Sequence, residues 1–217
     1  MNIALCCGYY YPDTLGGTEA YVQMLGHNLE ERGHHVTVVA PSTKNEGRKY
    51  THEGLEVIRY PVVQDPNRRE VRVASGPPKL GEWRKLLGRL NPDVVHMHSL
   101  TRGCSVSHAK VAVIHEIPLY VTIHVPEVTC PRGTMMRWGE VPCDGEVRPG
   151  RCGACVLQRQ GLPKPVAWGA SLLSLTGIGE VLPGRTGTAL QRGPQIRQRK
   201  EHIQDWLKAA QHVVVVA

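Results

Sequence analysis

Four of the seven cysteines lie in one segment of the second half of the chain, at a spacing typical of metal ligands. Cys130, Cys143, Cys152 and Cys155 form the pattern C-x12-C-x8-C-x2-C. Two thiolates separated by two residues can bind one tetrahedral ion, and two further thiolates would complete an all-cysteine zinc site. Such a site would hold together a Gly- and Pro-rich segment that has too few apolar residues to fold unaided. The spacing favours a structural zinc over four free thiols, and both over an iron–sulfur cluster.

Histidines form the second group of candidate residues, because an imidazole titrates near neutral pH and can bind a hydroxyl or a phosphate. His124 directly follows residues 119–123, an apolar run typical of a buried strand. His96 and His98 alternate along another such run, so their side chains point to the same side. Ligands of an open parallel sheet bind beyond the carboxyl ends of its strands. This placement favours His124 as the catalytic residue, while a purely structural hydrogen-bonding role stays open for each histidine.

A glycine pair near the N-terminus is the third candidate. Residues 2–7 predict a first strand, and Gly16 and Gly17 separate it from a helix that should run to Gly33, with Thr18 as its N-cap. Glycines let a backbone approach a ligand closely, and the unpaired N–H groups of a helix start favour an anion. A simple turn is the alternative, because neither the dinucleotide fingerprint nor the P-loop motif is present.

Apolar runs and helical spacings alternate along the chain and must position these residues. Further strands are predicted at residues 36–40, 55–63, 94–98, 119–123 and 213–217. Further helices are predicted at residues 83–90, 104–115 and 191–210. Strand, helix and strand in succession build right-handed βαβ units around a parallel sheet. We therefore expect an α/β fold, a Rossmann-like parallel β-sheet with helices on both faces.

Several segments depart from this alternation. Residues 42–54 are polar and predict a loop or an edge hairpin, and residues 64–79 predict a surface excursion. Residues 125–162 hold the four cysteines with little periodicity, so we expect a cysteine-rich loop insertion at about 126–162 within a single domain of residues 1–217. Residues 165–179 are the longest uncharged stretch, but they are too short for a spanning helix.

The composition is that of a basic globular protein. Hydrophobic residues make up 41%, and 26 Lys and Arg against 19 Asp and Glu give a formal charge of +7. A basic surface favours anionic partners such as nucleotide phosphates, lipid headgroups or nucleic acid, with a solvated basic face as the alternative. The first residues lack the basic region of a secretory signal, so we expect reduced thiols and a cytoplasmic protein, with peripheral contact at the inner membrane face.

Four stretches together resemble the N-terminal, acceptor-side domain of retaining glycosyltransferases of family 4, which have the two-Rossmann-domain GT-B architecture. The stretches are YPDTLGGTE at 11–19, LEERGHHVTVVAP at 29–41, NPDVVHMH at 91–98 and VTIH at 121–124. They occur in the expected order over residues 2–125. The segment TCPRG at 129–133, with the later cysteines, is similar to a cysteine-rich insertion found in some members.

The resemblance implies transfer of a sugar from a nucleotide-diphosphate donor to an acceptor hydroxyl with retention. Gly16 and Gly17 would approach the donor, and Glu19 would begin the helix behind them. His124 would contact the transferred sugar or the acceptor, while Thr18 and His98 complete the expected substrate-binding set. No cofactor is implied for catalysis, so any zinc would be structural. A glycan or a lipid-linked hydroxyl is the implied acceptor.

One half of the family pattern does not follow in these 217 residues. The family's second Rossmann domain carries the nucleotide site, with basic phosphate-binding residues and a paired-glutamate motif. We therefore expect half an enzyme, inactive alone, whose C-terminal nucleotide-sugar-binding domain is absent or belongs to a separate polypeptide.

Two other functions stay open on the residues alone. One is a zinc-stapled basic module that binds nucleic acid or another anionic partner, although it lacks interleaved aromatic residues and a recognition-helix pattern. The other is a stand-alone Rossmann-type enzyme that uses His124 as a base, against which the missing dinucleotide fingerprint argues.

Overall fold

A computed structural model describes residues 1–42, 46–62, 80–101, 103–177, 187 and 189–216. The chain forms two compact units. The first contains residues 1–124 and 205–217, and the second contains residues 125–204. The unit that holds the four cysteines therefore extends well beyond the predicted insertion at 126–162.

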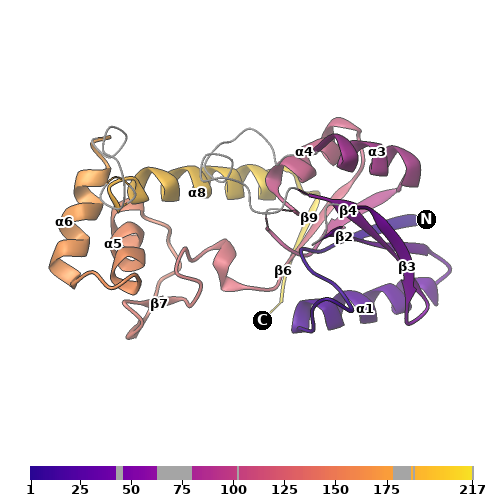
Figure 1. The fold of residues 1–217 in the computed structure, drawn as a ribbon, viewed down its shortest axis with the longest axis horizontal. Helices are drawn as coiled ribbons and strands as arrows, with labels where there is room; N and C mark the ends of the chain where they lie inside the picture. Colours follow the sequence, from indigo (N-terminus) through magenta and orange to yellow (C-terminus); the bar gives the residue numbers. More distant parts are fainter. Residues whose placement is uncertain (43–45, 63–79, 102, 178–186, 188, 217) are drawn as a thin grey trace. The chain divides into compact units, whose positions relative to one another are not determined.

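A mostly parallel sheet forms the centre of the first unit (Figure 1). Its strands are β1 (Asn2–Cys6), β2 (His35–Ser42), β3 (Arg48–His52), β4 (Leu55–Pro61), β5 (Val94–Met97), β6 (Leu119–Ile123) and β9 (His212–Val215). Their order is β3-β4-β2-β1-β5-β6-β9. Among the described strands of this sheet, only β3 pairs antiparallel, with β4, and this is the second of the two alternatives, a loop or an edge hairpin, that the polar segment predicted. At the other edge, β9 pairs with β6 and its four residues are exposed.

Helices lie on both faces of this sheet (Figure 1). Helix α1 (Gly17–Glu30) covers one face, while α3 (Leu80–Leu90) and α4 (Val106–Ile114) cover the other. Val22 of α1 packs with Leu5, Val38 and Val57 in a core cluster that the β-branched strands supply. The predicted Rossmann-like α/β class is therefore confirmed.

The second unit is mainly helical. It contains α5 (Pro149–Arg159), α6 (Lys164–Ser174), the first part of α8 (Arg192–Ala209), a 3-10 turn at Pro126–Val128 and a short hairpin of β7 (Met136–Arg137) with β8 (Val141–Pro142). Helices α5 and α6 pack through small residues. A Cβ on Gly153 would lie 2.2 Å from Ser171 Oγ, and Ser171 Oγ donates to the Gly150 carbonyl at 2.7 Å. Gly153 thus permits a helix contact that a larger residue would block.

Three expectations differ from the structure. The segment expected as an irregular loop contains α5, whose buried residues are Gly153, Ala154, Cys155 and Leu157. The strand predicted at residues 36–40 is longer in the structure, since Pro41 pairs with Tyr60 and β2 continues to Ser42. Thr18 is not the N-cap of α1, because the helix begins at Gly17 with Gly16 as its N-cap. The expected excursion at 64–79 lies outside the described residues.

No described helix combines the length and the apolar character that are needed to cross a bilayer.

Leu5 should contribute strongly to the stability of the first unit, because its side chain is fully buried in β1. Leu5→Ala removes buried methyl groups and leaves a cavity, so it should lower the free energy of unfolding by about 2–5 kcal/mol. Leu15→Ala is the matched control, since Leu15 is 83% exposed, and it should change the free energy by less than about 0.5 kcal/mol. Urea unfolding followed by circular dichroism measures both. Equal effects of the two substitutions would contradict this core assignment.

Candidate functional site

The candidate site lies where the sheet order changes direction. From β1 the chain proceeds to β2 on one side, whereas β5 pairs with β1 on the other. The backbone N–H of His98 donates to the Cys6 carbonyl at 2.8 Å, so the residues that follow β1 and β5 leave the sheet together. Open α/β sheets bind their ligands in the crevice at such a point.

Three histidines and a tyrosine gather at these strand ends. His98 Nδ1 lies 3.2 Å from His124 Nε2, and the His96 and His98 rings are 4.0 Å apart. His96 Nε2 lies 2.8 Å from Thr122 Oγ1. Tyr21 of α1 meets His124 edge-on, with ring centroids 4.8 Å apart. The structure therefore brings together His98 and His124, two of the predicted site residues, and adds Tyr21.

Burial keeps all three imidazoles neutral near pH 7. Burial, and then the nearby His124, lowers the pKa of His96 to about 4. Burial, followed by His96 and His124, holds the pKa of His98 well below its ordinary value. Burial also lowers the pKa of the partly exposed His124. A neutral imidazole has one donor and one acceptor nitrogen, so His124 can bind a hydroxyl without carrying charge.

His98 is 2% exposed, and its ring lies against His124 and His96. The prediction that His98 binds substrate directly stays a prediction. Its burial favours an effect exerted through His124 instead.

The glycine turn begins α1, as expected from the sequence, but Glu19 turns back toward it. A Cβ on Gly16 would lie 2.6 Å from Glu19 Oε2, so Gly16 leaves room for a carboxylate that is itself buried. Negative charge in the first turn of a helix interacts favourably with the helix dipole. Gly17 has no atom within 4 Å of its Cβ direction. Tyr21 follows Gly17 by four residues and therefore lies on the same face of α1. Because Tyr21 contacts His124, Gly17 lies on the face of α1 that is turned toward the histidines.

Arg59 of β4 fixes the loop that leads to this turn, and its side chain is only 4% exposed. Its guanidinium donates to the Tyr10 carbonyl at 2.6 Å, to the Tyr11 carbonyl at 3.1 Å and to Pro41 at 3.2 Å. It also pairs with Asp13 at 3.0 Å. Sequence reasoning missed Arg59 and Tyr21, because neither belongs to a local motif. The only local signal for Arg59 was its charge between two apolar neighbours, Ile58 and Tyr60, in β4.

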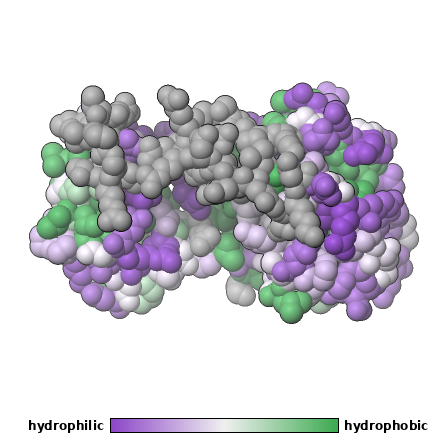
Figure 2. Space-filling model, in the orientation of Figure 1, coloured by the Kyte–Doolittle hydropathy of each residue, from purple (hydrophilic) through white to green (hydrophobic). Residues whose placement is uncertain are grey.

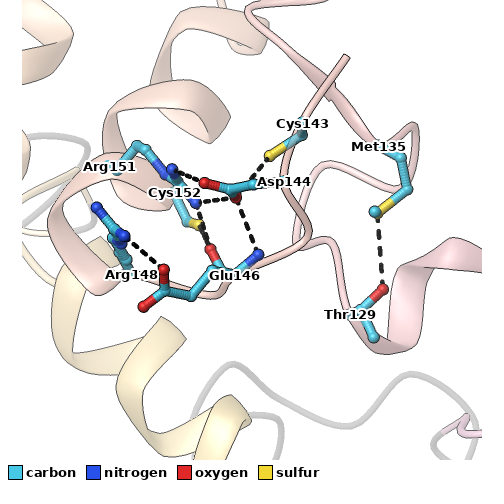
Figure 3. A network of polar contacts seen from close by, with 8 residues as sticks. All are labelled: Thr129, Met135, Cys143, Asp144, Glu146, Arg148, Arg151 and Cys152. Atoms are coloured by element: carbon cyan, nitrogen blue, oxygen red, sulfur yellow. Dashed lines mark hydrogen bonds and ion pairs between the residues drawn. The ribbon is translucent and has the colours of Figure 1, made fainter.

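The four later cysteines do not form a common site in the structure. Cys143 Sγ lies 3.7 Å from Asp144 Oδ1, and Cys152 Sγ lies 3.9 Å from the Glu146 carbonyl (Figure 3). The Trp138 N–H donates to Cys155 Sγ at 3.3 Å. Among the residues that the structure describes, no group of three or more His, Cys, Asp or Glu could hold a metal ion. The structural zinc therefore stays a prediction from the spacing alone.

Cys130 differs from the buried thiols of the first unit. Burial alone would raise the pKa of Cys130, but backbone N–H groups of residues 132–135 outweigh it and lower that pKa. Burial raises the pKa of Cys104 to about 12, and it raises the pKa of Cys6 and Cys7 well above the ordinary value. Because the thiolate is the reactive form, Cys130 should react readily and the buried three should not.

Comparison with known proteins adds a family. A protein from the cps region of Klebsiella pneumoniae, described as uncharacterized and of 42.6 kDa, is 30% identical over 148 residues, which are 57% of this chain and 38% of that protein. This chain thus spans well under half the length of that relative.

Two solved structures show a limited similarity to this chain. Sucrose-phosphate synthase from Thermosynechococcus elongatus is 18% identical, with a TM-score of 0.44 over 70% of this chain and 39% of that one. The catalytic domain of starch synthase IV from Arabidopsis thaliana, bound to ADP and acarbose, is 13% identical, with a TM-score of 0.37 over 98% of this chain and 51% of that one.

A family model described as the glycosyl transferase 4-like domain matches residues 16–172, which include the glycine turn, the three histidines and all four later cysteines. Because this match covers more than half of the chain, the protein belongs to the glycosyl transferase 4-like family.

Proposed function

We propose that this chain is the acceptor-side half of a retaining glycosyltransferase, which transfers a sugar from a nucleotide-diphosphate donor to an acceptor hydroxyl. The observation that carries the proposal is the His98–His124 pair at the carboxyl ends of β5 and β6, beside the start of α1, in a chain of this family. His124 is the partly exposed member of the pair and therefore the one that can meet a ligand.

The hydrogen bond between the two histidines assigns a role to each nitrogen. His98 Nε2 is buried and has no hydrogen-bond partner among the residues that the structure describes. A buried N–H without an acceptor is rarer than a buried acceptor without a donor, so we place the His98 proton on Nδ1. His98 then donates to Nε2 of His124, and the proton of neutral His124 must lie on Nδ1. His124 thereby presents a donor that suits an oxygen of a sugar hydroxyl or a phosphate.

The protein groups for nucleotide binding lie, by the family pattern, in a second Rossmann domain that is not within these 217 residues. We propose that transfer requires this domain, in the same or a separate polypeptide, and that a glycan or lipid-linked hydroxyl is the acceptor. The 217 residues alone should show no turnover of radiolabelled nucleotide sugars. Robust turnover by them would contradict the half-enzyme proposal.

His124→Ala should lower kcat/KM about 10- to 100-fold in the enzyme that includes the second domain, because one hydrogen bond to the reacting sugar or acceptor is lost. His115→Ala is the matched control, since His115 is an exposed histidine just after α4 and should leave kcat/KM unchanged. Initial rates with purified donor and acceptor measure both variants. A loss that is the same in both variants would remove His124 from the site.

The tautomer assignment has a spectroscopic test on the chain alone. His124 should carry its proton on Nδ1, with the Nε2 nitrogen shift of an acceptor in a long-range 1H–15N spectrum. His98→Asn should keep this state, because its side-chain N–H₂ can replace the Nδ1 donor, whereas His98→Leu should lose it. A proton found on His124 Nε2 in the unaltered protein would overturn the assignment.

Alkylation of thiols tests the arrangement of the cysteines. Limited iodoacetamide at neutral pH should modify Cys130 first, and Cys6, Cys7 and Cys104 only after unfolding, because burial and raised pKa values protect them. Mass spectrometry of peptides gives the order. A different result would support the four-thiolate site instead. In that case the protein would contain about one zinc per chain, and a chelator would be needed before iodoacetamide could modify Cys130, Cys143, Cys152 and Cys155.

A further inference from the structure

Helix α6 exposes its large apolar side chains and buries its small ones. Val166 is 56% exposed, Leu172 is 54% exposed and Leu173 is 53% exposed. The residues that face the rest of the second unit are Ala167, Ser171 and Ser174, all fully buried. Figure 2 shows hydrophobic residues at the surface where α6 lies in Figure 1. This reverses the usual amphipathic pattern of a surface helix.

The packing of the second unit fixes this orientation. Ser171 Oγ donates to the Gly150 carbonyl at 2.7 Å, and the Gly193 N–H donates to Ser174 Oγ at 2.9 Å. A Cβ on Gly153 would collide with Ser171 Oγ. Helices α5 and α6 therefore approach too closely for a Leu in place of Ser171. Rotating α6 to bury its leucines would break both hydrogen bonds. The apolar face is therefore a stable feature of the unit, and exposed apolar patches mark interaction sites.

Aromatic and basic side chains border the apolar face. The Trp168 ring lies 6.2 Å from the Trp138 ring, and Lys164 Nζ lies 5.9 Å from the Trp138 ring while it pairs with Glu140. Trp and Lys are favoured at the boundary of a bilayer, because each has an apolar body and a polar end. A helix with Leu and Trp on one side and cations at its border is typical of proteins that lie in the membrane interface.

The charge of the second unit selects the kind of membrane. Residues 125–204 contain 11 Lys and Arg and 6 Asp and Glu, a formal charge of 11 − 6 = +5 out of +7 for the chain. An anionic bilayer attracts basic residues that lie within about a Debye length of its surface. The exposed face of a single helix is convex and offers no groove. A lipid surface can bind such a face, because it does not require a complementary shape. The charge therefore favours an anionic bilayer over a protein partner.

We propose that the α6 face docks on an anionic lipid membrane. Val166, Leu172 and Leu173 enter the acyl boundary, Trp168 lies at the headgroup level, and the net positive charge of the unit attracts the anionic headgroups. This contact does not depend on sugar transfer, so it can be tested on the chain without a donor or the second domain.

Co-sedimentation with vesicles tests the docking. The chain should bind vesicles of phosphatidylglycerol and phosphatidylcholine, and bind pure phosphatidylcholine at least tenfold more weakly. Leu172→Gln with Leu173→Gln should lower the partition coefficient for the anionic vesicles about tenfold, because two apolar side chains no longer enter the boundary. The matched control is Val113→Gln with Ile114→Gln, a pair on α4 with exposures of 43% and 70%, and it should bind as the unaltered chain does. Circular dichroism confirms that each variant is folded.

Three results would overturn the proposal. One is a lack of binding to anionic vesicles, and another is equal weakening by the α4 and α6 pairs. The third is self-association in sedimentation velocity that the α6 pair abolishes without a change in vesicle binding, which would assign the face to a second copy of this chain.

Discussion

The buried guanidinium of Arg59 is the interaction on which the candidate site depends. Its donors are used by the carbonyls of Tyr10, Tyr11 and Pro41, by the Tyr50 hydroxyl at 3.1 Å and by the Asp13 carboxylate. The Tyr10 and Tyr11 carbonyls lie in a loop that has no helix or strand to satisfy them, whereas Pro41 belongs to β2. Without Arg59 they would face a partly dry interior, which is costly for unpaired polar groups. A single cation in β4 therefore holds the loop that ends in Gly16 and Gly17.

The histidine cluster shows how the same sheet produces polarity at one end. Inward-facing residues such as Leu5 and Val38 are fully buried and apolar, while the residues just beyond β5 and β6 are His98 and His124. Burial shifts their pKa values down, so the cluster gains hydrogen-bonding capacity without adding charge. Neutral imidazoles suit the uncharged part of a ligand whose charged groups bind to other residues.

The sequence predicted the sheet well, because each parallel strand is a continuous apolar run that local reading detects. It also placed His98 and His124 at strand ends, where the structure joins them. Arg59 and Tyr21 escaped, because their roles depend on contacts 48 and 103 residues away along the chain. Helix α6 escaped because Ala167 and Ser171 point inward and its leucines outward, which inverts the pattern that sequence reading expects.

The two edges of the sheet differ in how they resist uncontrolled pairing. Strand β3 closes one edge with Arg48 and Lys49, and such charges discourage a foreign strand from adding there. At the other edge, β9 presents Val213, Val214 and Val215, all exposed and β-branched. In concentrated solution, these 217 residues should therefore aggregate through the β9 edge and not through the charged β3 edge. Covering the β9 edge should raise their solubility.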